Sequence, residues 1–201
     1  LMFRLKNLKP LERSWVLYDV ANSAYILTII TVLFPLYYDI VGSALPQDER
    51  DSLFMIVTAV IALTTAILSP FIGSLSNYRG NKKKFFVLFL IIAIVGTFAL
   101  IIPGLSYVAL LAFFVISSIS YGLTNVVYDA FLVDVTNEDR MDYVSSQGYA
   151  WGYIGSMIPF FVALIPYALV TFGVLDPEAT LIGRPHEYLT IAFAFIIAMA
   201  W

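Results

Sequence analysis

The sequence predicts an all-α integral membrane protein, and three observations lead to this prediction. Of the 201 residues, 61% are hydrophobic and only 12% are charged, whereas soluble domains carry about 25% charged residues. The mean hydropathy is +0.89. The apolar residues also fall in blocks close to the roughly 20 residues that a helix needs to cross a bilayer. We therefore expect membrane-spanning helices joined by short polar loops.

Six segments are apolar and long enough, or nearly so, to be membrane helices. Asp51 and Ser52 are suitable residues to start the second helix, and Pro103-Gly104 closes the third. Pro159 and Pro166 are expected to kink the fifth. The predicted helices are 14–38, 52–75, 85–102, 106–133, 144–172 and 188–201.

The sixth segment is short, and we expect the chain to end inside that helix. At about 1.5 Å per residue it reaches roughly 21 Å, less than a bilayer core of about 30 Å. The first residue is Leu1 rather than methionine. We therefore treat residues 1–201 as one transmembrane bundle that is part of a longer protein, with a second half not present.

The basic residues predict that the N-terminus is cytoplasmic, because lysine and arginine are retained on the cytoplasmic side of short loops. With this orientation, the outer loops hold only Arg50 and Arg184. The other nine basic residues are cytoplasmic: Arg4, Lys6, Lys9, Arg13, Arg79, Lys82, Lys83, Lys84 and Arg140. The acidic segment 134–142 is expected to be a solvated cytoplasmic loop, or alternatively to pair with these basic residues.

Composition also argues against several classes of function. There is no basic face of the kind that binds nucleic acid. Cysteine is absent, which leaves no disulfide framework and no thiolate metal site. The single histidine, His186, is expected in a solvated loop. We therefore expect a protein that is not an enzyme and that has no cofactor and no metal.

The turn GSLSNYRGNKKKFF, residues 73–86, connects the second and third predicted helices. It resembles the loop G-x-L-x-D-x-x-G-R-K-K of the major facilitator superfamily. Three further stretches narrow the resemblance: SWVLYDVANSAY at 14–25, YDAFLVD at 128–134 and VSSQGYAWGYIG at 144–155. Together they look like the vacuole-effluxer-like branch, which includes an autophagy-related amino-acid effluxer.

The resemblance implies twelve helices in two halves, each half built from two inverted three-helix repeats. This chain would be the N-terminal six-helix half, and its partner would be the C-terminal half of the same protein. The family places an aspartate where Asn77 stands and an arginine where Asn81 stands, so a charge contact that closes the cytoplasmic side is in question. Residues of the expected gate are Gly73, Asn77, Arg79, Gly80, Lys82 and Lys83.

Two carboxylates fall within predicted membrane helices, where a charge is costly and therefore a candidate for function. They are Asp19 and Asp129, each preceded by a tyrosine. Polar residues repeat around them every three or four positions, including Ser117 and Ser118, which predicts one polar face on the first helix and one on the fourth. The resemblance implies that helices one, two, four and five line the central cavity. Candidate residues for solute contact or coupling are Tyr18, Asp19, Asn22, Tyr121, Asn125, Tyr128, Asp129 and Tyr149.

Other interpretations of these residues stay open at the level of sequence. Asp19 and Asp129 could instead form structural ion pairs with Arg13, Arg79 or Arg140. The deeper asparagines could be interhelical hydrogen-bonding groups. In the fifth helix, Gly148, Gly152 and Gly155 are expected to let a neighbouring backbone approach closely.

The sequence thus predicts a secondary transporter that moves a small polar solute, an amino acid or a similar metabolite, across a lipid bilayer. Alternating access and efflux are expected by analogy with the family, and proton coupling through Asp19 or Asp129 is a hypothesis. The membrane would be a bacterial plasma membrane, or a vacuolar membrane in a eukaryote. The alternative is a receptor or scaffold that uses the transporter fold without transport.

Overall fold

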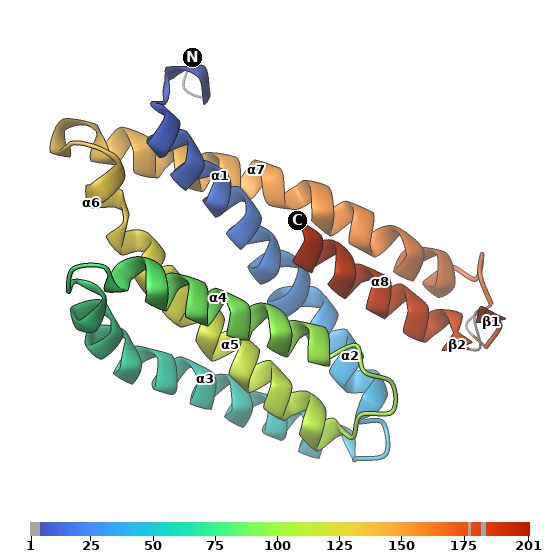
Figure 1. The fold of residues 1–201 in the computed structure, drawn as a ribbon. Helices are drawn as coiled ribbons and strands as arrows, with labels where there is room; N and C mark the ends of the chain where they lie inside the picture. The colour runs from blue at the N-terminus through green and yellow to red at the C-terminus, as the bar shows by residue number, and fades with distance from the viewer. Residues whose placement is uncertain (1–4, 177, 182–183) are drawn as a thin grey trace. The chain divides into compact units, whose positions relative to one another are not determined.

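The computed structural model describes residues 5–176, 178–181 and 184–201, and helices account for most of them (Figure 1). This confirms the all-α class. A two-residue antiparallel pair, β1 (Thr180–Leu181) with β2 (Arg184–Pro185), precedes the last helix. The helices are η1 (Leu5–Asn7), α1 (Pro10–Ala24), η2 (Tyr25–Leu33), α2 (Phe34–Val41), α3 (Gln47–Ser76), α4 (Asn81–Ala99), α5 (Tyr107–Ala130), α6 (Leu132–Val135), α7 (Glu138–Thr171) and α8 (His186–Ala200).

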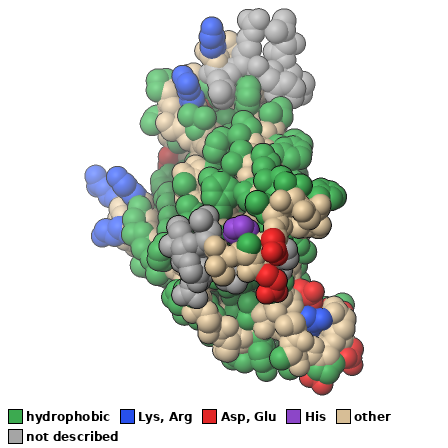
Figure 2. Space-filling view, turned by 90° about the vertical axis from the view of Figure 1, so that its right-hand side faces the viewer, with side chains coloured by type: hydrophobic (Ala, Val, Ile, Leu, Met, Phe, Trp, Pro, Cys, Tyr) green, Lys and Arg blue, Asp and Glu red, His purple; other side chains and the backbone are tan. Residues whose placement is uncertain are grey.

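Among the residues that the structure describes, four stretches are long and apolar enough to cross a membrane. They are Pro10–Val41, Gln47–Ser76, Tyr107–Val135 and Glu138–Thr171, with mean hydropathies between 1.8 and 2.2. Hydrophobic side chains also cover much of the face drawn in Figure 2. On α3, Leu63 and Phe71 are each 63% exposed. Such exposed apolar side chains are expected where lipid is the solvent.

Most of the helices begin earlier than the apolar runs predict. α3 begins at Gln47 rather than at Asp51 or Ser52, and α4 at Asn81 rather than Phe85. α7 begins at Glu138 rather than Val144. An apolar run marks only the part of a helix that lipid tolerates, whereas backbone hydrogen bonding continues into the polar flank.

The expected loop at 134–142 is therefore wrong. α6 ends at Val135 and α7 begins at Glu138, so only a short connection separates them. Glu138 and Asp139 lie in the first turn of α7, where the helix dipole favours negative charge. The acidic residues thus support the start of a helix.

The chain forms two compact units. The first comprises the described residues up to Tyr37 together with those from Glu138 onward. In it α1 packs along α7, and α8 packs on both α7 and η2. Its core holds fully buried Val16, Ile29 and Phe195.

The second unit runs from Tyr38 to Asn137. Here α5 packs against both α3 and α4, which also touch each other (Figure 1). Phe114 of α5 is 1% exposed and its ring stacks 6.3 Å from that of Phe54. α5 is thus the central helix of this unit.

Between α1 and α2 the helix widens into the nine-residue π-helix η2. The cap amide of Phe34 donates to the carbonyl of Ile29, five residues back. Pro35 follows, and a proline ring clashes with the carbonyl four residues before it while offering no N–H donor. Six of the nine η2 residues are also β-branched and weak helix formers. We attribute the wide turns to these two causes.

Candidate functional site

Asp19 lies at the packed interface between α1 and α7. Its Oδ2 would be 3.0 Å from a Cβ built on Gly148 and 3.4 Å from one built on Gly152. The residue is partly buried. The carboxylate is therefore held against the backbone of α7, which only glycine leaves open at these two positions.

The three glycines of α7 together bring the two helices close. A Cβ at Gly148 would also lie 2.7 Å from the Trp15 ring, and one at Gly152 would lie 2.7 Å from Ser23 Oγ. A Cβ at Gly155 would collide with Val20. Contacts under 3.0 Å force a shift, so the spacing of α1 and α7 depends on bare glycine.

The other candidates in the first unit take different positions. Tyr18 and Asn22 are partly buried on α1. Tyr149 directly follows Gly148 and is 65% exposed, so it does not share the glycine face. Nearby on α7, the indole Nε1 of Trp151 is buried and has no hydrogen-bond partner among the described residues.

The polar residues of α5 do not form a single face, contrary to the sequence interpretation. Ser117 turns to α4, where its Oγ lies 2.6 Å from Thr97 Oγ1 and donates to the Ala93 carbonyl at 3.0 Å. Tyr121 and Tyr128 are buried, at 9% and 5% exposure, whereas Asp129 is exposed. Asn125 is partly buried, and its Oδ1 is buried.

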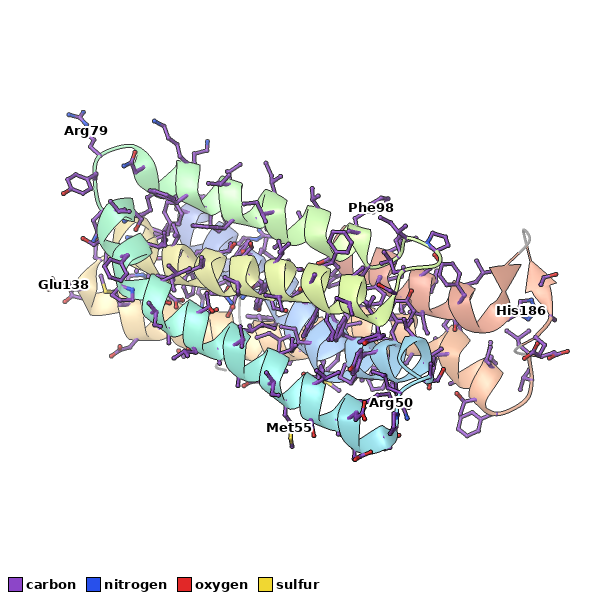
Figure 3. The ribbon with its side chains drawn as sticks, turned by 90° about the horizontal axis from the view of Figure 1, so that it is seen from below. Arg50, Met55, Arg79, Phe98, Glu138 and His186 are labelled. Atoms are coloured by element: carbon purple, nitrogen blue, oxygen red, sulfur yellow. The ribbon has the colours of Figure 1, made fainter. Side chains whose placement is uncertain are left out.

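The turn between α3 and α4 carries the expected gate residues. Gly80 adopts φ 81°, a left-handed conformation that side chains other than glycine adopt at a cost. Asn77 is the C-cap of α3 and is exposed. Arg79 lies at the tip of the turn, beyond the end of α3 opposite Arg50 (Figure 3). A Cβ built on Gly73 would lie 3.7 Å from Val126 Cγ1 of α5, an ordinary contact. Lys83 is exposed.

Lys82 connects this turn to the end of α5. Its Nζ lies 2.6 Å from Asp134 Oδ2 and donates to the Ala130 carbonyl at 3.0 Å. It also lies 5.6 Å from the centre of the Phe131 ring. Three lysines in the first turn of α4 are unfavourable beside the positive end of the helix dipole. The contacts of Lys82 offset part of that cost.

Sequence reasoning missed Glu12, which is fully buried at the start of α1. Arg140 of α7 donates to it through Nε at 2.9 Å and Nη2 at 2.8 Å. The Lys9 amide donates to Glu12 Oε2 at 2.8 Å, and Arg140 Nη2 also donates to the Asn7 carbonyl at 3.2 Å. Arg140 therefore pairs with Glu12, and not with the two aspartates considered above. The signal in the sequence was a glutamate three residues after Lys9, a spacing that suits a helix N-terminus.

At the other end of the second unit, Arg50 in the first turn of α3 connects that helix to the end of α2. Its Nη1 lies 3.0 Å from Asp39 Oδ1 and donates to the Asp39 carbonyl at 2.7 Å. Within the residues that the structure describes, no three histidine or acidic side chains are close enough to hold a metal ion. His186 lies in the first turn of α8 rather than in a loop.

Comparison of the sequence with known proteins identifies its family. The family described as Major Facilitator Superfamily matches residues 2–160. An uncharacterized MFS-type transporter of Bacillus subtilis is 40% identical over 192 residues, which cover 94% of this chain and 45% of the relative. An uncharacterized protein of Aquifex aeolicus is 26% identical over 154 residues, or 76% of this chain and 37% of that protein.

The chain thus spans less than half the length of the curated relatives it matches. No solved structure matches it.

Proposed function

Because the chain belongs to the major facilitator superfamily, a family of multi-pass membrane transporters, we propose that it is half of a secondary transporter working by alternating access. The other half would be the C-terminal part of the same protein. Two bundles that rock about a site near the membrane centre are the usual arrangement for such carriers.

The observation that carries the proposal is the position of Asp19. A carboxylate inside a membrane helix is costly, and such groups mark ion and proton pathways. Asp19 is held beside Gly148 and Gly152 on the α1–α7 interface, with the tyrosine Tyr18 before it and Asn22 one turn later. This set can bind the ammonium group of a solute or exchange a proton. Asp129 is the second coupling candidate; it is exposed at the end of α5.

The solute we propose is an amino acid or a similar small polar metabolite, moved outward. The support is the likeness of residues 14–25, 128–134 and 144–155 to the vacuole-effluxer-like branch. The membrane is then a bacterial plasma membrane, in keeping with the bacterial relatives.

We place the N-terminus in the cytoplasm. Lys82, at the start of α4, pairs with Asp134, just beyond α5, as expected if both lie at one membrane surface. Arg79 and Arg50 lie at opposite ends of α3 (Figure 3). A cysteine at position 79 should react with an impermeant maleimide only after the membrane is opened, and one at position 43 should react in intact cells. The reverse pattern would refute this orientation.

The coupling role of Asp19 is tested with the full-length protein in liposomes. Asp19→Asn should abolish solute accumulation driven by a pH gradient and leave exchange of labelled for unlabelled solute intact. Asp129→Asn tests the second carboxylate in the same assay. Gradient-driven accumulation at the wild-type rate in both variants would overturn proton coupling through these residues.

A further inference from the structure

Three buried oxygens of the second unit have no hydrogen-bond partner among the residues that the structure describes. They are Thr65 Oγ1 of α3, Ser118 Oγ of α5 and Asn125 Oδ1 of α5. The Ser118 residue is only 5% exposed. Buried polar groups are nearly always paired, so three unpaired ones in one unit call for an explanation.

One close contact and helix register relate the three groups to the packing of α3 on α5. A Cβ built on Gly122 of α5 would lie 2.7 Å from Thr65 Cγ2 and 3.4 Å from Thr65 Oγ1. Thr65 is therefore seated on the gap that Gly122 leaves. Ser118 and Asn125 stand four residues before and three residues after Gly122, which puts them on the same face of α5. By register, we therefore expect Ser118 and Asn125 on the side of α5 where Gly122 meets Thr65.

Other hydroxyls of the same unit do form hydrogen bonds within the protein, unlike those of Thr65 and Ser118. Thr97 and Ser117 bond each other and the Ala93 carbonyl at the α4–α5 contact. Ser69 donates to the Thr65 carbonyl at 2.6 Å and Thr124 to the Ser120 carbonyl at 2.8 Å. Serine and threonine in helices commonly bond back to the preceding turn in this way. Thr65 and Ser118 do not.

We propose that Thr65, Ser118 and Asn125 form a hydrogen-bonding surface for the transported solute. This inference rests on the proposed transport function and deepens it. The Asn125 carbonyl oxygen can only accept, whereas each hydroxyl can accept or donate. A ligand that satisfies all three oxygens is therefore a small molecule with at least one N–H or O–H donor. Ordered water has the same chemistry, and the experiment below separates the two. Thr65 is the residue that sequence patterning did not single out.

The test uses the purified full-length protein and its melting temperature against increasing concentrations of serine, glutamine or xylitol. Glycine betaine, which has no N–H or O–H donor, is the control probe. Thr65→Val keeps the methyl group that packs on Gly122, and Ser118→Ala removes only a hydroxyl. We expect at least one donor probe, but not betaine, to stabilise the wild type. Each substitution should raise the probe concentration that gives half of the maximal stabilisation about tenfold, because one hydrogen bond to the probe is lost.

The matched controls are Thr97→Val and Ser117→Ala, which remove hydroxyls that are bonded within the protein. They should lower the melting temperature without solute and leave the half-saturating concentration unchanged. Thr65→Val should not lower the solute-free melting temperature, because its hydroxyl has no bond to lose. If Thr65→Val destabilises the solute-free protein as Thr97→Val does, and keeps the wild-type response to solute, ordered water satisfies the hydroxyl and the inference fails.

Other results would also overturn the inference. These are a wild type that none of the donor probes stabilises, stabilisation by betaine equal to that by the donor probes, or wild-type half-saturation in both Thr65→Val and Ser118→Ala. If the wild type exchanges a solute in liposomes while both variants keep its affinity, this surface is wrong and transport stands. If solute binds through these residues but does not exchange, the surface stands and the transport proposal fails.

Discussion

Single glycines decide how closely α1 and α7 approach. Replacing Gly155 by alanine adds a methyl group that meets Val20. We expect Gly155→Ala to lower the unfolding free energy by about 1–3 kcal/mol, as overpacking does, although alanine is the better helix former by about 1 kcal/mol. Chemical denaturation in detergent measures the difference.

Gly73→Ala is the matched control for this prediction. The nearest atom to its added Cβ, on Val126, is 3.7 Å away, an ordinary contact. This variant should be as stable as the wild type or more stable. Equal effects of the two substitutions would show that helix propensity, rather than close packing, governs both sites.

Glu12 and Arg140 are the second place where single residues decide the structure. Glu12 is fully buried and accepts two hydrogen bonds from the Arg140 guanidinium. Removing one member of a buried ion pair leaves the charge of the other without a partner. Glu12→Gln should therefore lower the melting temperature clearly. Asp39→Asn, which removes the 57% exposed partner of Arg50, should change it little because exposed ion pairs contribute little.

A double-mutant cycle separates this pair from a general loss of charge. Once Glu12→Gln is present, Arg140→Gln should cost much less than it does in the wild type. Strictly additive losses would mean that the two side chains do not stabilise the fold through each other.

At the scale of the element, η2 is the segment most open to rearrangement. Pro35→Ala supplies an N–H donor and removes the ring that clashes with the carbonyl four residues earlier. We expect η2 to tighten to α-helical hydrogen bonding and the amides of residues 26–34 to exchange hydrogen more slowly. Hydrogen–deuterium exchange followed by mass spectrometry tests this. Pro166→Ala in α7 is the control and should leave these amides unchanged; unaltered exchange in Pro35→Ala would rule out proline as the cause.

The elements also show what sequence can predict. The all-helical class follows directly from the apolar runs, since the physics of lipid leaves few other options. The sequence does not reveal that helices begin at Asn81 and Glu138, because the polar residues there are compatible with both a loop and a helix. Polar periodicity predicted that the polar residues of α5 share one face, and the structure contradicts this. It could not separate Ser117, which bonds to α4, from Ser118, because that depends on which neighbours surround the helix.

Prediction of the candidate site from the sequence has similar limits. Asp19 stands out in the sequence because a carboxylate in an apolar run is unusual. Glu12 does not, since it precedes the apolar run and resembles a solvated charge until Arg140 is placed beside it. Thr65 is likewise inconspicuous, because threonine is common in apolar helices and only its missing partner makes it a candidate.

At the scale of the whole molecule, we propose that this chain is half of a transporter. The measurement that tests this most directly is counterflow with the full-length protein in liposomes. The vesicles are preloaded with unlabelled amino acids, and the entry of labelled leucine and tyrosine is followed. We expect label to accumulate above the equilibrium level in these vesicles and not in liposomes without protein. Equal label in the two, with the protein shown to be folded and inserted, would contradict it.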